Sequence, residues 1–224
     1  DEWMESWLEL WDGKPGESNK LPGYGWIFPL GDGTANVGLG ILNTSAAFQN
    51  MDYKDSMRRW LAHVDPAFGF TDENLVAPIK SAALPMGFNR KPHYGRGLML
   101  VGDSGGMVNP FNGEGIDYAL EAGHIAAETI TQALARPEGP ARERVLHSYQ
   151  AAVDAAYGGY FTLGRAVAKM VGNPTFMELA TKYGLPRKSL MKFTLKLMAN
   201  LTDARGGDAH DKIINALTKI APDA

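Results

Sequence analysis

The sequence predicts an α+β protein, with strands and turns in the first hundred residues and helices in the last third. Three observations support this fold class. Two apolar stretches flank a glycine turn at residues 31–33, which is typical of a hairpin. A short apolar run and a glycine-rich loop occupy residues 97–115. From residue 141 onward the composition is that of helices.

The first predicted element is a strand over residues 3–11. Trp3, Trp7 and Trp11 would also share one face of a helix, but the turn signal at residues 12–16 favours the strand. The hairpin follows, with arms at residues 24–30 and 35–42.

A helix and a further strand complete this region. Asp52 has the side chain and spacing of a helix cap, which predicts a helix from there to about Val64, before Pro66. Residues 75–83 are predicted as another strand.

The second region begins at Gly97. Residues 98–101 form an apolar run without alternation, as expected of a strand buried on both faces. A loop over 102–115 and a helix over 116–134 come next. The helical remainder is expected to break at three points, namely 172–174, 184–186 and 206–207.

Composition excludes several classes of protein. The 224 residues carry a net charge of −3, which argues against a dedicated nucleic-acid binder, and their 45% apolar content is too high for a disordered chain. With no cysteine, disulfide scaffolds, thiolate zinc sites and iron–sulfur clusters are excluded. The five histidines show no metal-binding spacing, so no metal site is predicted.

Residues 102–106 have two functional interpretations besides that of an ordinary glycine-rich turn. Residues 102–106, Gly-Asp-Ser-Gly-Gly, match the nucleophile segment of trypsin-like proteases, but that reading needs a two-barrel β fold and a placed histidine. Within the longer string 98–123, a carboxylate at a strand end could hold ribityl hydroxyls, and glycines would let the backbone approach a flat ring. The start of the next helix would favour the negative charge of a reduced flavin.

This string resembles the second FAD-binding motif of flavoproteins related to p-hydroxybenzoate hydroxylase. The resemblance implies FAD as cofactor, Asp103 on the ribityl chain and residues 112–116 beside the isoalloxazine. Where that family often has Ala-Ala-His after Gly-Asp, this chain has residues 104–106, Ser-Gly-Gly, which points away from aromatic hydroxylases. The implied cofactor-binding residues are Gly102, Asp103, Pro110, Asn112, Gly113, Glu114, Gly115 and Ile116.

Aromatic residues alternate on the first arm of the hairpin. Taken alone, this pattern is that of an aromatic core strand. Together with the loop it resembles the Tyr-x-Trp-x-Phe-Pro … Gly-x-Gly signature of the geranylgeranyl reductase family, closest to its menaquinone reductase branch. The residues that this resemblance assigns to an isoprenoid or polyprenyl substrate are Tyr24, Trp26, Phe28, Pro29, Gly38 and Gly40.

The Gly-x-Gly-x-x-Gly motif that holds the ADP part of FAD does not occur in the sequence. We therefore expect the C-terminal part of a larger p-hydroxybenzoate-hydroxylase-like FAD protein. The expected division is a substrate-side β-sheet region with one helix over 1–90, the end of the FAD-binding domain over 91–138 and a helical region over 139–224.

The activity implied by the resemblance is reduction of isolated double bonds in a geranylgeranyl or menaquinone tail. The electron donor stays open, and Glu114 is either a proton carrier or an ordinary loop carboxylate. A flavin monooxygenase or halogenase on the same scaffold and a non-catalytic lipid-binding fragment are the alternatives.

A basic stripe lies near the end of the chain. Lys188, Lys192 and Lys196 share one side of a predicted amphipathic helix, which is either a solvated face or a contact with an anionic membrane. We expect a cytoplasmic protein, with this helix as a peripheral contact on the inner face of the cell membrane.

Overall fold

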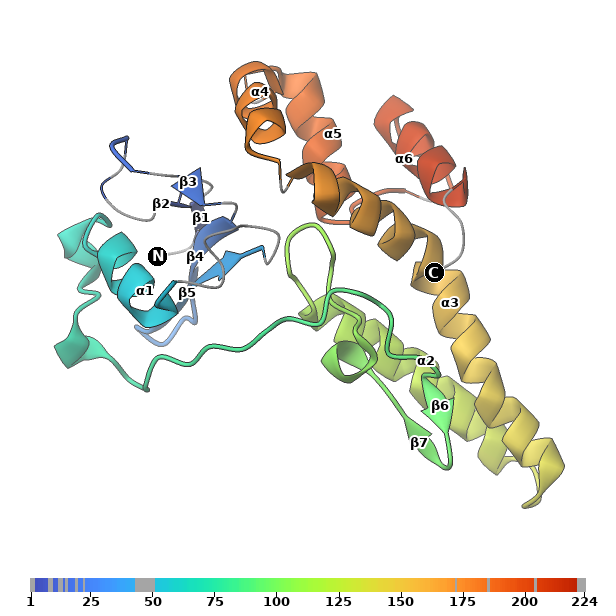
Figure 1. The fold of residues 1–224 in the computed structure, drawn as a ribbon. Helices are drawn as coiled ribbons and strands as arrows, with labels where there is room; N and C mark the ends of the chain where they lie inside the picture. The colour runs from blue at the N-terminus through green and yellow to red at the C-terminus, as the bar shows by residue number, and fades with distance from the viewer. Residues whose placement is uncertain are drawn as a thin grey trace. The chain divides into compact units, whose positions relative to one another are not determined.

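The computed structural model describes residues 3–7, 10, 11, 14, 16–18, 20, 21, 23–42, 51–171, 173–184, 186–203 and 205–220. The chain divides into two compact units, Asp1–Ala83 and Leu84–Ala224 (Figure 1). The mixture of strands and helices confirms the α+β class.

The first unit is built on a three-stranded antiparallel sheet in the order β1-β4-β5, formed by β1 (Glu5–Trp7), β4 (Gly23–Pro29) and β5 (Ala35–Ile41). The predicted hairpin is confirmed. Its turn contains Gly31 and Gly33, both with positive φ, a conformation that glycine adopts without steric cost. The predicted tryptophan strand is present as two short pieces, β1 and β2 (Leu10–Trp11), of which β2 pairs with β3 (Lys20–Leu21).

One face of this sheet packs against helix α1 (Tyr53–Leu61). Asp52 caps the helix as predicted, and its carboxylate accepts hydrogen bonds from the backbone N–H groups of Lys54 and Asp55. From the helix, Trp60 lies against the sheet together with buried Ile27. The unit thus has its own small hydrophobic core.

The strand predicted over residues 75–83 is wrong. Two short 3₁₀ turns, η2 (Pro66–Phe68) and η3 (Asp72–Asn74), follow α1, and the chain beyond them pairs with no described strand. Val76 is 83% exposed, and Pro78 has no N–H to contribute to a ladder. Apolar composition alone therefore does not produce a strand here, because none of the described strands pairs with this segment.

The second unit opens with a hairpin of two very short strands, β6 (Tyr94–Gly95) and β7 (Leu98–Met99), followed by the turn η4 (Gly102–Gly105). The prediction that residues 98–101 are buried on both faces is wrong in this structure, since Leu98 is 63% exposed. Its one partner among the described strands is the two-residue β6, which covers neither face of the run.

In the described residues of this unit five helices follow: α2 (Ile116–Leu134), α3 (Pro140–Val171), α4 (Pro174–Gly184), α5 (Lys188–Met198) and α6 (Ala209–Ile220). Their boundaries confirm the predicted helix over 116–134 and the predicted break points. The long α3 runs beside α2 (Figure 1), and the core between them is rich in aromatic rings, with Tyr118, Tyr157 and Phe161 in mutual edge contact.

An ion-pair cluster joins α5 to α6. Asp211, whose side chain is 2% exposed, accepts a hydrogen bond of 2.6 Å from Lys196 Nζ. Lys192 bonds Asp208 at 2.5 Å, and Lys196 also reaches this carboxylate. Two lysines of the predicted basic stripe are therefore neutralised by partners on the neighbouring segment.

Lys196→Met should lower the thermal unfolding midpoint of the chain, because Asp211 would keep a buried charge without its cation. Lys196 lowers the pKa of Asp211, and Lys192 lowers that of Asp208. Carboxylates with depressed pKa values stabilise the fold above the usual carboxyl range near pH 4 and lose this contribution as the pH falls. The loss in Lys196→Met should thus be large at pH 7 and small at pH 2. Exposed Lys188→Met is the control, and an equal effect of the two variants at pH 7 would contradict the assignment.

Candidate functional site

The glycine-rich loop after β7 turns sharply because its glycines adopt backbone conformations that other residues rarely adopt. Gly102 and Gly106 have φ of +58° and +74°, and a Cβ on Gly102 would lie 2.8 Å from that of Ala119 on α2. Ser104 closes the turn, since its Oγ donates to the carbonyl of Val101 at 2.7 Å and accepts from the N–H of the same residue at 2.9 Å. The loop therefore lies directly against α2.

His93 supports this loop from the protein interior. The side chain is fully buried, and Nε2 lies 3.0 Å from the carbonyl oxygen of Gly105. Burial lowers the pKa of His93, and because a carbonyl only accepts, Nε2 of the neutral ring donates this bond. His93 was not predicted as part of the site. Its role depends on the hydrogen bond to Gly105, a contact that the spacing of residues in the sequence does not reveal.

Asn109 organises the second half of the loop and was also missed. Its fully buried amide donates to Tyr160 Oη on α3 at 3.1 Å and to the carbonyl of Met198 at the end of α5 at 2.9 Å. Its Oδ1 accepts from the N–H of Phe111 at 2.9 Å. The Asn-Pro pair at 109–110 was a local signal of a turn, but the two helix contacts are long-range.

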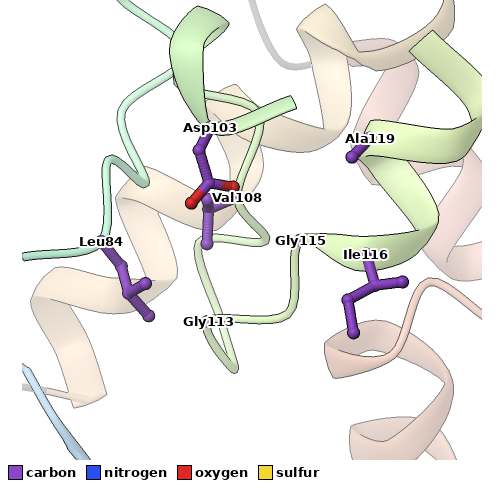
Figure 2. A pocket seen from close by; sticks show the side chains of 7 residues that line it. All are labelled: Leu84, Asp103, Val108, Gly113, Gly115, Ile116 and Ala119. Carbon is purple, nitrogen blue, oxygen red and sulfur yellow. The ribbon is translucent and has the colours of Figure 1, made fainter. Parts of the chain in front are cut away.

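Between the loop and α2 is a pocket of about 290 Å³, shown in Figure 2. The Asp103 carboxylate points into the space near Val108, and the loop backbone at Gly113 lies on the opposite side. A Cβ on Gly115 would lie 3.1 Å from Asp103 Oδ1, a tight contact, so the carboxylate lies close to the helix start at a position without a side chain. The residues that line the pocket are Leu84, Asp103, Val108, Gly113, Gly115, Ile116 and Ala119.

The predicted cofactor residues thus divide into two groups. Asp103, Gly113, Gly115 and Ile116 line the pocket, next to Gly102 in the turn. Pro110 does not line it: the ring is buried against α3, so closely that a Cβ on Gly164 would lie 2.0 Å from it. Pro110 therefore anchors the loop.

Asn112 and Glu114 also lie in the loop without lining the pocket. Asn112 Oδ1 accepts from the N–H of Glu114 at 2.9 Å. Desolvation by the surrounding protein, and then the charge of Asp117, raise the pKa of Glu114, although a hydrogen bond from Asn112 acts in the opposite direction. The carboxyl group consequently holds a proton to a higher pH than an ordinary glutamate.

Helix α2 begins at this pocket, and Asp117 in its first turn accepts a hydrogen bond from the N–H of Tyr118 at 2.8 Å. The N-cap is Gly115, which has no side chain to bond the preceding N–H groups of Ile116 and Asp117. Free N–H groups and the helix dipole make such a start favourable for an anionic ligand. Opposite it, the acidic Asp103 can accept hydrogen bonds from hydroxyl groups. The pocket therefore suits a ligand that carries hydroxyls and a site of negative charge.

A second group of predicted site residues lies on the sheet of the first unit. Tyr24, Trp26 and Phe28 alternate along β4, so they share the face opposite Trp60. Their ring centroids are 5.8 Å and 6.1 Å apart along the series. The three rings are half-buried, which leaves part of each ring accessible.

The register places the predicted glycines on the same aromatic face. Gly40 pairs with Tyr24 and Gly38 with Trp26. Pro29 is paired with Ala35, and strand alternation places it on the other face, where Ala35 packs at the edge of the core. The structure thus brings together five of the six predicted substrate residues.

The protease reading finds no support in this geometry. Both hydrogen bonds of Ser104 Oγ go to the backbone of Val101, and the buried His93 contacts the carbonyl of Gly105 instead of this hydroxyl. In the described part of the chain no three His, Asp or Glu side chains gather as a metal site, and no helix is long and apolar enough to cross a membrane.

Comparison with known proteins identifies the family. A model of the geranylgeranyl reductase catalytic domain matches residues 16–75, which include the aromatic hairpin and α1. Menaquinone reductase of Mycobacterium tuberculosis is 34% identical over 202 residues, 90% of this chain and 46% of the relative. The chain belongs to the geranylgeranyl reductase family. The menaquinone reductase of Mycolicibacterium smegmatis is also 34% identical, over 92% of this chain and 47% of its own length.

Two further matches have lower sequence identity. Digeranylgeranylglycerophospholipid reductase 2 of Methanopyrus kandleri is 29% identical over 76% of this chain. Among solved structures, a geranylgeranyl bacteriochlorophyll reductase-like protein from Thermoplasma acidophilum shares the fold, with a TM-score of 0.55 at 18% identity over 96% of this chain and 54% of that protein. The chain spans about half the length of the curated relatives it matches.

Proposed function

We propose that this chain is part of an FAD-dependent reductase that saturates isolated double bonds in an isoprenoid chain, such as a geranylgeranyl group or the tail of menaquinone. The observation that carries the proposal is the pocket in which Asp103 lies beside the first turn of α2, whose N-cap Gly115 has no side chain, in a chain of this family. The aromatic face of the sheet supplies the second requirement, a surface for a long apolar ligand.

The pocket fits the ring end of a flavin by its donors and its free space. Asp103 would accept hydrogen bonds from ribityl hydroxyls, and the N–H groups at Gly115 and Ile116 would favour negative charge on the ring. Gly113 and Gly115 line the pocket with backbone alone, which would let a flat ring approach the chain closely. When bound, FAD supplies the hydride for an alkene reduction.

Glu114 is our candidate for handling the proton that such a reduction also needs. Its raised pKa leaves a larger protonated fraction near neutral pH than an ordinary glutamate has. The residue lies beside Gly113 and Gly115, in the loop that would border the ring.

We extend the proposal to the architecture of p-hydroxybenzoate hydroxylase-like flavoproteins, with the division into residues 1–90, 91–138 and 139–224. Flavin retention would then need additional protein, because the motif for the ADP part is absent from the sequence. An exposed apolar stripe on α2 is consistent with a further packing partner there. Its large members are Ile116, Leu120, Ile130 and Leu134.

Two other functions use the same features. A flavin monooxygenase or halogenase would share the loop, and a lipid-binding fragment would share only the aromatic face. The reductase is favoured over the monooxygenase because Tyr24, Trp26 and Phe28 form a continuous apolar surface, suited to a polyprenyl chain rather than to a small polar aromatic substrate.

The deciding experiment places this chain in the M. smegmatis menaquinone reductase, in exchange for the 214-residue region it matches. With reduced FAD and no oxygen, the chimera should convert a polyprenyl quinone to a product heavier by two hydrogen atoms, measured by mass spectrometry. The unmodified relative is the control for the assay. A product heavier by one oxygen atom, formed only in air, would overturn the reductase in favour of a monooxygenase.

We also propose that the chain acts at the inner face of the cell membrane, where a polyprenyl substrate resides. The predicted basic stripe contributes less than expected, since Lys192 and Lys196 are ion-paired. Stronger support comes from α4, where Phe176, Leu179 and Tyr183 are exposed at helical spacing.

This contact predicts that the chain co-sediments with vesicles containing anionic lipid. Leu179→Glu should reduce the bound fraction, because a carboxylate would enter the anionic interface. Leu217→Glu on α6 introduces the same charge at another exposed leucine and should have little effect. Equal losses in the two variants, or no binding by the unmodified chain, would contradict a contact through α4.

A further inference from the structure

The two glycines of the Gly38-Leu39-Gly40 segment have different surroundings. A Cβ on Gly38 would lie 2.2 Å from Cζ2 and 2.6 Å from Cε2 of the Trp26 ring, a distance that no real side chain tolerates. A Cβ on Gly40 would meet the same ring at 3.8 Å, an ordinary van der Waals contact. Gly38 is therefore the gap in β5 across which the indole lies, whereas Gly40 is not covered in this way.

Asn36 fixes the polar end of the same indole. Trp26 Nε1 donates to Asn36 Oδ1 at 2.8 Å, and Asn36 lies opposite Phe28 on the neighbouring strand. The ring is thus held by a hydrogen bond at Asn36 and by close packing on Gly38. In this position Trp26 stacks on Phe28, with an interplanar angle of 28°.

A second tryptophan–glycine contact, on the other face of the sheet, shows by comparison that the contact at Gly38 is not simply core packing. There Trp60 lies over Gly25, where a Cβ would be 2.5 Å from its ring, and Trp60 is only 9% exposed. Trp26 makes the same kind of contact with a glycine but stays half-buried. Its outer surface is consequently free to receive a ligand.

We propose that Gly38 and Asn36 are positioning residues for the Trp26 ring. They set the distance of the ring from β5 and its orientation, and thereby shape the surface that an apolar chain would contact. With its N–H already bonded to Asn36, the indole presents carbon atoms alone to a ligand lying along β4. A ligand without polar groups loses no hydrogen bond when it lies against this ring. A ligand with a hydroxyl group beside the ring would find no free hydrogen-bond donor on the indole. The identity of the ligand rests on the proposed function, but the positioning of Trp26 does not.

The test uses the whole 224-residue chain and two independent readouts. The first is the Trp26 indole N–H resonance in an NMR spectrum, assigned through its loss in Trp26→Phe. The second is the affinity for geranylgeraniol in detergent micelles, followed by tryptophan fluorescence. Gly38→Ala should shift the resonance and weaken binding by about tenfold or more, since a displacement of the ring by about 1 Å is unavoidable. Gly95→Ala on β6, outside the predicted site, should change neither by more than about twofold, because a Cβ there would meet no atom within 4 Å.

Asn36 provides variants that leave the backbone unchanged, in case Gly38→Ala does not fold. Asn36→Leu removes the acceptor and should shift the indole resonance and weaken binding severalfold. Asn36→Asp keeps an acceptor and should restore both. An unshifted indole resonance in Gly38→Ala and Asn36→Leu would overturn the proposal, as would unchanged affinity despite a displaced ring. If the unmodified chain does not bind geranylgeraniol, the proposed substrate class fails, and the resonance alone decides the positioning claim.

Discussion

The buried amide of Asn109 is the interaction on which the second unit depends most. A loop of glycines and turns has many backbone groups that must find partners when buried, and it supplies few side chains to do so. Asn109 bonds the loop backbone at Phe111 and, through its two N–H bonds, connects it to Tyr160 on α3 and to the end of α5. The tight contact between Pro110 and Gly164 fixes the same segment against α3. The helical region therefore serves as the support that gives the loop between Gly102 and Gly115 one conformation.

Close approach at glycine is the second constraint, and it operates in both units. At Gly102 and Gly115 a missing side chain lets the loop lie against α2, with the Asp103 carboxylate beside the helix start. At Gly38 it lets an indole lie across a strand. In each case glycine makes space for a functional group on a neighbouring element, which explains why these short motifs carry information about function.

Local features were predicted well from the sequence, and long-range ones were not. The hairpin turn, the Asp52 cap and the helix over 116–134 depend on neighbouring residues, and the structure confirms each of them. The strand over 75–83 was wrong because a strand needs a partner, which its own sequence does not supply. His93 and Asn109 were missed for a related reason: their partners lie on segments far along the chain. Pro29 shows a third limit, since a family signature does not say which of its members share a face.

The central claim, that the loop from Gly102 to Ile116 receives the ring end of a flavin, can be tested directly on this chain. FAD would be titrated into isotopically labelled protein, and the backbone amide shifts followed by NMR. Binding should be weak, with the largest shifts at Asp103, Gly113, Gly115 and Ile116. Asp103→Ala should weaken it by about tenfold, as expected for the loss of one charge-assisted hydrogen bond, whereas Ser104→Ala should bind nearly as the unmodified chain does. Shifts confined to other parts of the protein, or an unchanged affinity in Asp103→Ala, would contradict the account.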